Sequence, residues 1–320
     1  MQVRDLYFLL VIALLKVIGW SSSPRLKNVV VHSIAAAAYR LSRNKRRRCE
    51  ENVTRTFCED LGKQQRRRIV KRAFSEFWRD VFSLTLSRRE KAALKAIELS
   101  GVEHLQAALN AGRGAILWES NSFGQRHLAK HLLHERGFSL HQVHSEGHLG
   151  GFWSEQHVAT WVRHHIVKPF FERCEKSVIQ EILYLPDSDS LVFTRRLRER
   201  LKQNAILCIA GDGGSGRKTI PQLLFGHTKL FATGMVSLAK ISGAPILPMF
   251  CVQEADGKIR LIIKRPVRVE TEVERVQGVE SSVAEYVGLL ESFIRRYPEQ
   301  YRSWHYLDRF PQPREPTLEA

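Results

Sequence analysis

A polar segment, ESNSFGQRH (residues 119–127), follows the apolar run AILW and contains groups that could perform acid–base chemistry. It contains Glu119, Asn121, Ser122, Arg126 and His127. A junction between a strand and a helix offers free backbone N–H groups and the positive end of the helix dipole. Ser122 or Asn121 could instead serve only as a helix N-cap. Packing does not explain a carboxylate directly after an apolar strand, so Glu119 is a candidate functional residue.

A second candidate, GDGGSGRKT, spans residues 211–219 and follows the strand-like run AILCIA. It is similar to a phosphate-binding loop, but its lysine falls one residue late after GxxxxG. The segment IPQLLFG comes next, where a phosphate loop would need a helix, so no nucleotide site is expected. Asp212 stands at the end of the strand, where open α/β sheets place functional groups. It could also be a simple turn former.

Histidines are frequent just after the first polar segment. His127, His131 and His134 share one helical face. No carboxylate or thiolate has matching spacing, so we expect a solvated or interface face and no metal site or cofactor. His141 and His144 follow on the next predicted strand. Arg195 and Arg196 lie in the run RRLRER, which could bind an acceptor phosphate or an acidic carrier protein, or could be a solvated helix face.

Composition narrows the class of protein. The 320 residues are 43% hydrophobic and 26% charged, which excludes a disordered or collagen-like chain. Only one segment is apolar enough to enter a bilayer, so a polytopic membrane protein is excluded. The net charge of +17 indicates an anionic partner. The five cysteines are widely spaced without a CxxC, which favours a reducing compartment and structural thiols.

The apolar segment is LYFLLVIALLKVIGW, residues 6–20, interrupted by Lys16. At 1.5 Å per residue it reaches ~22 Å, short of a ~30 Å hydrocarbon core. It could be a short span or a helix embedded in one leaflet; a signal peptide ending near Ser21–Ser23 and a buried soluble helix are the alternatives. We expect a membrane anchor over residues 1–23. The cations that follow it place the body on the cytoplasmic side.

A basic segment follows the anchor. Between Arg40 and Arg72 there are 13 Lys or Arg residues against 4 Asp or Glu, a net charge of +9. Its place beside the anchor favours contact with anionic lipid headgroups over a merely solvated helix face. Nucleic acid is not expected as a partner, because no recognised nucleic-acid motif is present and aromatics are not interleaved with the basic run.

The periodicity predicts which elements position these residues. Residues 24–110 look helical throughout. Strands are expected over 115–118, 138–143, 205–210, 245–252 and 259–264, and helices over 124–136, 153–172, 189–203, 232–242 and 279–296. This alternation predicts an α/β fold with a mixed, largely parallel central sheet flanked by helices. We therefore expect an anchor, a basic helical region over 24–112, an α/β domain over 113–310 and a loose tail over 311–320.

The ordered features resemble the lauroyl/myristoyl transferase family of late lipid A acyltransferases, within the lysophospholipid-type acyltransferases. The resemblance runs from the anchor to about Phe310. Its carriers are Asn52 in RRRCEENVTRTF, GAILWE leading to Phe123 and Gly124, AILCIAGDGG with Asp212, LLFG, FATGMVSLAKISGAPILPMF, and the terminal ESFIRRYPEQYRSW. The resemblance implies transfer of an acyl group from acyl carrier protein or acyl-CoA to a hydroxyl of a membrane lipid or glycolipid. It places the protein at a bacterial inner membrane.

The resemblance also implies a histidine base and a carboxylate spaced as HxxxxD/E at the strand-to-helix junction. Here the sequence departs from the family pattern. Aligned on Phe123 and Gly124, the family histidine falls on Ser122 and the carboxylate on His127. Without a gap in the strand, the two positions are Asn121 and Arg126. Neither alignment gives a histidine with an acid.

Two arrangements would restore the chemistry. In the first, His127 is the base and Glu119 orients it, while Ser122 or backbone N–H groups stabilise the oxyanion. In the second, His141 or His144 enters the site from the next strand. Ser122 as an acylated nucleophile is a further possibility. The remaining alternative is a catalytically degenerate acyltransferase-like membrane protein that binds lipid or a partner without turnover.

Overall fold

The computed structural model describes residues 3–20, 23–57, 60–145, 148–149, 152–153, 160–186, 191–212, 218–269 and 275–307. Their centre is a seven-stranded sheet with the order β1-β11-β10-β2-β7-β3-β6. Neighbouring strands run parallel, except for the antiparallel pair β10 and β11. The strands are β1 (Glu98–Ser100), β2 (Ala115–Glu119), β3 (Leu140–Ser145), β6 (Glu181–Leu185), β7 (Ile206–Ala210), β10 (Ile246–Gln253) and β11 (Ile259–Ile263). The short strands β4 (His148–Leu149) and β5 (Phe152–Trp153) pair outside this sheet.

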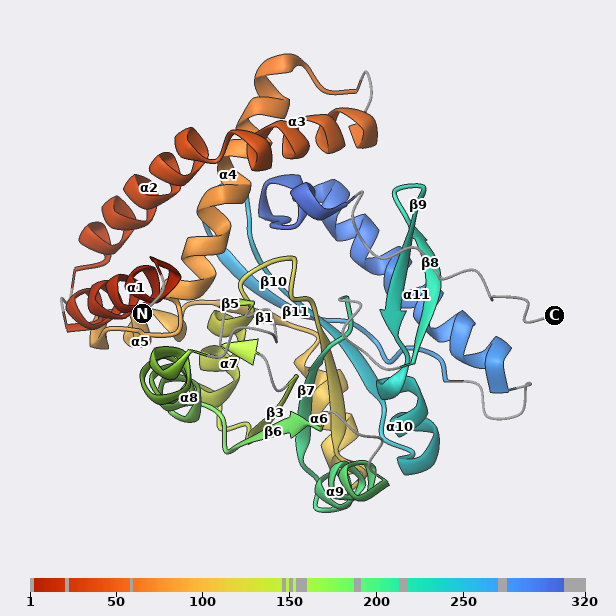
Figure 1. Cartoon of the computed structure of the whole chain (residues 1–320). Coiled ribbons are helices and arrows are strands. Elements are labelled where there is room, and N and C mark those ends of the chain that lie inside the picture. Colours follow the sequence, from red (N-terminus) through yellow and green to blue (C-terminus); the bar gives the residue numbers. More distant parts are fainter. Residues whose placement is uncertain are drawn as a thin grey trace.

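Helices cover both faces of the sheet, as a largely parallel sheet requires (Figure 1). Along β2, Ala115 and Leu117 pack in one apolar cluster, and Ile116 and Trp118 pack in another on the opposite face. The first face carries α6 (Val102–Asn110) and α7 (Arg126–Glu135), and the second carries α9 (Leu191–Lys202), α10 (Gly234–Ser242) and α11 (Arg275–Arg296). Every residue of β2 is buried, so its carboxyl end brings Glu119 into the interior.

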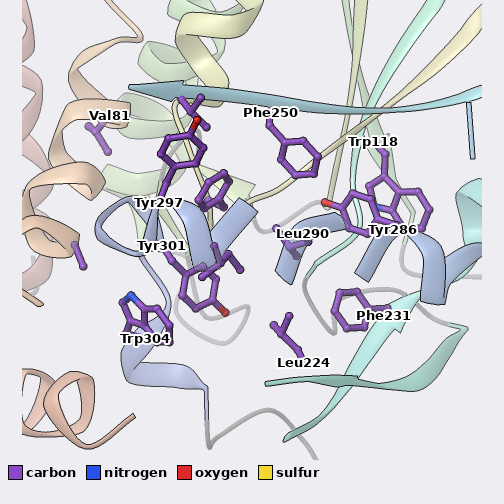
Figure 2. Packing of buried hydrophobic residues seen from close by; sticks show 14 of the residues in the cluster. Val81, Trp118, Leu224, Phe231, Phe250, Tyr286, Leu290, Tyr297, Tyr301 and Trp304 are labelled. Atoms are coloured by element: carbon purple, nitrogen blue, oxygen red, sulfur yellow. The ribbon is translucent and has the colours of Figure 1, made fainter. Parts of the chain in front are cut away.

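The packing of α11 closes the second face. Figure 2 shows Tyr286 and Leu290 of this helix facing Trp118 and Phe250 of the sheet. The rings of Trp118 and Tyr286 stack with centroids 3.9 Å apart. The Tyr286 hydroxyl donates to the Glu119 carbonyl oxygen at 3.4 Å. A hairpin of β8 (Thr219–Leu224) and β9 (His227–Ala232) packs against α11. The stacked rings of Trp118 and Tyr286 therefore hold the carboxyl end of β2 against α11.

The N-terminal region is a set of helices beside the sheet. They are α1 (Val3–Trp20), α2 (Pro24–Leu41), α3 (Arg43–Phe57), α4 (Lys63–Phe82) and α5 (Arg88–Leu94). Helix α1 buries Phe8, Val11 and Leu15, whereas Leu6 and Leu10 on its other side are exposed. Searched over the described residues, no helix combines the length and the apolarity that crossing a bilayer needs. The predicted membrane-anchor span is therefore not supported.

Most of the predicted elements are confirmed. Strands β2, β3, β7, β10 and β11 and helices α7, α9, α10 and α11 lie where the periodicity placed them, within a few residues. The helix predicted over 153–172 is wrong at Trp153, which lies in β5, and residues 154–159 lie outside the described residues. From residue 161 on it is helical, with a π-helical turn (Arg163–Val167) leading into α8 (Lys168–Lys176). The prediction that residues 24–110 are all helical is wrong at β1, and β6, β8 and β9 were not predicted. Residues 213–217 of the glycine-rich turn, Ser21, Ser22, Cys58 and the tail 311–320 lie outside the described residues.

Candidate functional site

Asp212 fixes the loop that follows β2. This loop, residues 120–125 and hereafter the β2–α7 loop, lies where β2 and β7 end side by side. The Asp212 carboxylate accepts hydrogen bonds from the Ser120 hydroxyl, from the Asn121 N–H at 2.7 Å and from the Ser122 N–H at 3.0 Å. Asp212 thus does more than form a turn, because it positions the segment in which the sequence places the chemistry. These N–H groups are engaged, so they do not supply the predicted backbone oxyanion hole.

The C-terminal segment holds the same loop from the other side. The Arg302 N–H donates to the Ser122 carbonyl at 2.7 Å, and its guanidinium donates to the Asn121 carbonyl at 2.6 Å. The same guanidinium lies 2.6 Å from the Asp80 carboxylate of α4. Nearby, the Asn52 amide donates to the Trp304 carbonyl at 2.7 Å. The family-like segment around Asn52 therefore contacts the C-terminal segment that holds the loop.

Glu119 is not paired with His127. Its carboxylate is buried and lies 3.2 Å from the Lys130 ammonium. The Gln142 amide donates to it at 3.0 Å, and Arg126 lies 3.9 Å away. A buried carboxylate needs a charge-compensating partner, and Lys130 supplies one where a neutral imidazole would not. The predicted Glu119–His127 pair is thus replaced by a Glu119–Lys130 ion pair.

Two other carboxylates flank the imidazole of His127. Its Nε2 lies 3.8 Å from Asp80, and its Nδ1 lies 4.0 Å from Glu175 of α8. Nε2 forms no hydrogen bond with a described residue. Burial, with the nearby Arg126 and Lys130, holds the pKa of His127 well below its usual range. The imidazole is therefore neutral at pH 7 and can accept a proton.

A histidine–carboxylate pair does form at β3, which is separated from β2 by β7 in the sheet. His144 Nε2 and the Glu175 carboxylate are 2.8 Å apart, and both residues are buried. Burial raises the pKa of Glu175, but His144, Lys130 and His127 more than offset it and hold that pKa well below its usual range. The second predicted arrangement has His141 or His144 enter the site from the next strand, and His144 does lie beside Glu175, the carboxylate that also flanks His127. His141 lies apart from it, 3.9 Å from Glu181 at the first residue of β6.

The remaining predicted residues fall in two places. The Arg126 guanidinium donates to the Asn121 side-chain oxygen at 2.5 Å, and Asn121 is exposed in the β2–α7 loop. Arg196 donates to Glu181 at 2.6 Å, and Arg195 is exposed on the same helix. Glu181 begins β6, whereas the loop lies at the opposite ends of the strands. The structure does not bring Arg195 and Arg196 to this loop.

Sequence reasoning missed Asp80, Glu175 and Arg302. Asp80 and Glu175 lie within amphipathic helices, where a carboxylate has no distinguishing local pattern. Arg302 falls within the terminal family-like segment, and this was the one available signal. Together with Glu119, His127 and Lys130 these residues form a buried ionic network beside the β2–α7 loop. Such a network can hold one neutral imidazole among compensated charges, and a neutral imidazole has one ring nitrogen that can accept a proton. Among the described residues, no group of histidines, cysteines and carboxylates could hold a metal ion.

The three histidines predicted to form a solvated or interface face are divided between the two. His127 and His131 are buried against neighbouring elements, and His134 is exposed. Helix α7 turns this face toward α4, α5 and α8, because the polar groups there have partners in the interior. Burial lowers the pKa of His131 to about 4.

Acid should therefore weaken the folded state through His131. The unfolded chain takes up a proton near pH 6.5, whereas the folded chain does so only near pH 4, so this contribution is intact above pH 6.5 and is lost as the pH falls. We expect His131 to account for a loss of about 2 kcal/mol between pH 7 and pH 5. Urea unfolding at both pH values, on the parent chain and on His131→Gln, measures it. Equal losses in both proteins would contradict the assignment.

Comparison with known proteins gives one family. Residues 2–309 match the family model described as bacterial lipid A biosynthesis acyltransferase. A phosphatidylinositol mannoside acyltransferase of Mycobacterium tuberculosis (strain ATCC 25618 / H37Rv) is 30% identical over 186 residues, which cover 58% of this chain and 54% of the relative. A protein of the same name from Mycolicibacterium smegmatis is 23% identical over 235 residues, covering 73% and 68%. A lipid A biosynthesis acyltransferase of Haemophilus influenzae is 23% identical over 275 residues, covering 81% and 74%. The chain thus spans about half the length of the first relative.

Proposed function

The chain belongs to the bacterial lipid A biosynthesis acyltransferase family, and we propose that it transfers a fatty acyl group from a carrier thioester to a hydroxyl of a membrane lipid or glycolipid. The carrier is acyl carrier protein or acyl-CoA. The observation that carries the proposal is the family match over residues 2–309. The relatives are named for a phosphatidylinositol mannoside and for lipid A, which supports a glycolipid as the acceptor.

In the proposed reaction the acceptor oxygen attacks the thioester carbonyl, the carbon–sulfur bond breaks, and the carrier leaves as a thiol. His127 takes the acceptor proton and returns it to the leaving sulfur. Asp80 and Glu175 stabilise the imidazolium that forms, because they lie 3.8 Å and 4.0 Å from the two ring nitrogens, whereas Glu119 contacts Lys130 instead of His127. His127 is only 2% exposed, so the substrate must displace side chains at the loop to reach it.

Ser122 is proposed to stabilise the oxyanion with its hydroxyl. It stands where the family histidine falls, and its hydroxyl forms no hydrogen bond within the described part of the chain. Its backbone is fixed by Asp212 and Arg302, so the side chain is presented from a rigid loop. Asn121, which is exposed in the β2–α7 loop, and its hydrogen-bond partner Arg126 are proposed to contact the acceptor. A preorganised donor in a site that excludes water stabilises developing charge more than the same donor in water.

The proposed location is the cytoplasmic face of a bacterial inner membrane, with α1 lying in the interface. Leu6, Leu10 and Val17 form an exposed stripe on α1, while its other face packs on the protein. The exposed cations of α3 and α4, such as Arg47 and Arg67, supply attraction to anionic lipids. Exposed Arg195 on α9 is proposed to contact the acidic carrier protein.

The test is acyl transfer by purified full-length protein bound to vesicles of phosphatidylglycerol. Labelled acyl carrier protein or acyl-CoA is added with a total lipid extract, and label in any lipid is compared with a sample lacking protein. A labelled glycolipid is the expected result. No labelled lipid with either donor across several chain lengths would overturn the proposal.

A second candidate is a family member that binds lipid without turnover. Two observations favour it. The alignment on Phe123 and Gly124 puts serine, Ser122, where the family has its histidine, and the N–H groups of Asn121 and Ser122 are already engaged by Asp212. In that case the same preparation retains labelled lipid on the protein but forms no new ester. Chromatography of the extracted lipids separates the two results.

A further inference from the structure

A pocket of about 310 Å³ lies between α1, α7, α8 and the connection from α4 to α5. Figure 1 shows α1, α5 and α8 gathered on one side of the sheet. Leu15, Leu84, Leu86 and Phe170 provide its apolar walls. The volume falls within the range of small-ligand sites. None of its lining residues belongs to the β2–α7 loop, so it is a separate pocket.

Two cations stand at this pocket without compensating acids. Lys16 and Lys91 line it and are exposed, and neither forms an ion pair with any residue in the described part of the chain. The Lys16 ammonium lies 5.9 Å from the centroid of the Phe170 ring. The neighbouring Lys27 differs, because its ammonium is 2.8 Å from Glu90. The residues that line the pocket therefore carry a net positive charge.

A buried polar atom without a partner also lies in the pocket wall. The Thr85 hydroxyl is buried and forms no hydrogen bond with a described residue. Its backbone carbonyl is engaged, because it accepts from Lys27 at 3.0 Å. Buried polar side-chain atoms are usually paired, so an unpaired hydroxyl in the wall of a pocket that two cations also line indicates a place for a ligand oxygen.

The exposed apolar side of α1 begins next to a residue of the pocket lining. Lys16 lines the pocket, and the next residue of α1, Val17, belongs to the exposed stripe. A ligand with one charged end and one apolar end can satisfy both parts of this surface. The phosphate would meet the cations and the Thr85 hydroxyl, while a chain would cover the apolar wall.

We propose that this pocket binds one anionic phospholipid of the membrane, with its phosphate between Lys16, Lys91 and Thr85 and an acyl chain against Leu15, Leu84 and Phe170. The site is distinct from the proposed acyl-transfer site and does not require that the protein turns over. Charge complementarity identifies the head as anionic, and the apolar walls distinguish a lipid from free phosphate.

The probe is octyl phosphate, kept below its critical micelle concentration and titrated calorimetrically into the full-length protein. Octyl glucoside supplies the chain without the charge, and inorganic phosphate supplies the charge without the chain. The test variants are K16Q/K91Q and Thr85→Val. The matched control is K218Q/K258Q, which removes two exposed charges that lie outside the pocket lining and outside α3 and α4. Circular dichroism confirms that every variant folds.

We expect octyl phosphate to bind at least about tenfold more tightly than either control ligand, since each tenfold step corresponds to ~1.4 kcal/mol. K16Q/K91Q should weaken binding about tenfold or more, Thr85→Val by a smaller factor, and K218Q/K258Q by less than twofold. Equal binding of octyl glucoside would overturn the head-group assignment, and equal binding of inorganic phosphate would overturn the lipid assignment. Equal losses in K16Q/K91Q and K218Q/K258Q, or no binding of octyl phosphate, would overturn the site itself.

Discussion

His127→Gln should lower the turnover number for acyl transfer by about 100-fold or more and leave KM nearly unchanged. A general base contributes on the order of 10²–10⁴ in rate, and glutamine fills a similar volume but cannot accept the proton. Burial holds the pKa of His127 well below its usual range, so the parent enzyme should keep its rate as the pH falls from 8 to 6. Steady-state rates with labelled acyl donor over this range measure both effects.

The matched control is His134→Gln, because His134 is exposed on the same helix and should change the rate less than twofold. His144→Gln separates the two imidazoles near Glu175. If His144→Gln abolishes turnover and His127→Gln does not, the base belongs to the His144–Glu175 pair and the His127 assignment is wrong. Unchanged rates in both variants would remove histidine catalysis from this network.

Asp212→Ala should both destabilise the protein and inactivate it. The change leaves the Ser120 hydroxyl and the N–H groups of Asn121 and Ser122 without their buried acceptor. A buried donor without a partner costs ~1–3 kcal/mol, so we expect a loss of about 3–5 kcal/mol in the free energy of unfolding. Urea denaturation measures this loss.

The same change should lower kcat/KM for acyl transfer by about 100-fold, because a shift of ~1 Å in a positioned group has an effect of that size. Ser120→Ala is the graded control, since it removes only one of the donors to Asp212 and should lose about 1 kcal/mol. Asp212→Asn keeps the volume and one oxygen and should fall between the two. Equal stability of Asp212→Ala and the parent would show that the loop does not depend on this carboxylate.

The local elements of the sheet domain follow from periodicity. Apolar runs such as residues 115–118 and 245–252 became β2 and β10, because a strand buried on both faces has no polar side to display. The strands that were missed have weaker signals: β1 has three residues, and β8 contains Pro221 and alternates half-buried and exposed side chains. Parallel packing then explains why Glu119 and Asp212 lie at the same edge.

Which face of α1 is covered was decided by tertiary contacts. The apolar run of residues 6–20 predicted a membrane anchor, and the sequence contains no sign of which face of the helix packs on the protein. In the folded chain Asp5 is buried, accepts from the Thr160 hydroxyl at 2.7 Å and lies 3.5 Å from Arg163. A buried carboxylate needs such partners, and they come from a distant segment that periodicity cannot identify.

The sequence by itself determined the fold class, the family resemblance and the segment in which the polar groups gather. Only the tertiary structure decided which charges meet. Glu119 pairs with Lys130, and His127 lies between Asp80 and Glu175. These residues come from β2 and from three helices, α4, α7 and α8, that are far apart in the sequence. In a low-dielectric interior each carboxylate takes the nearest cation, and that choice depends on how α4, α7 and α8 pack rather than on spacing along the chain.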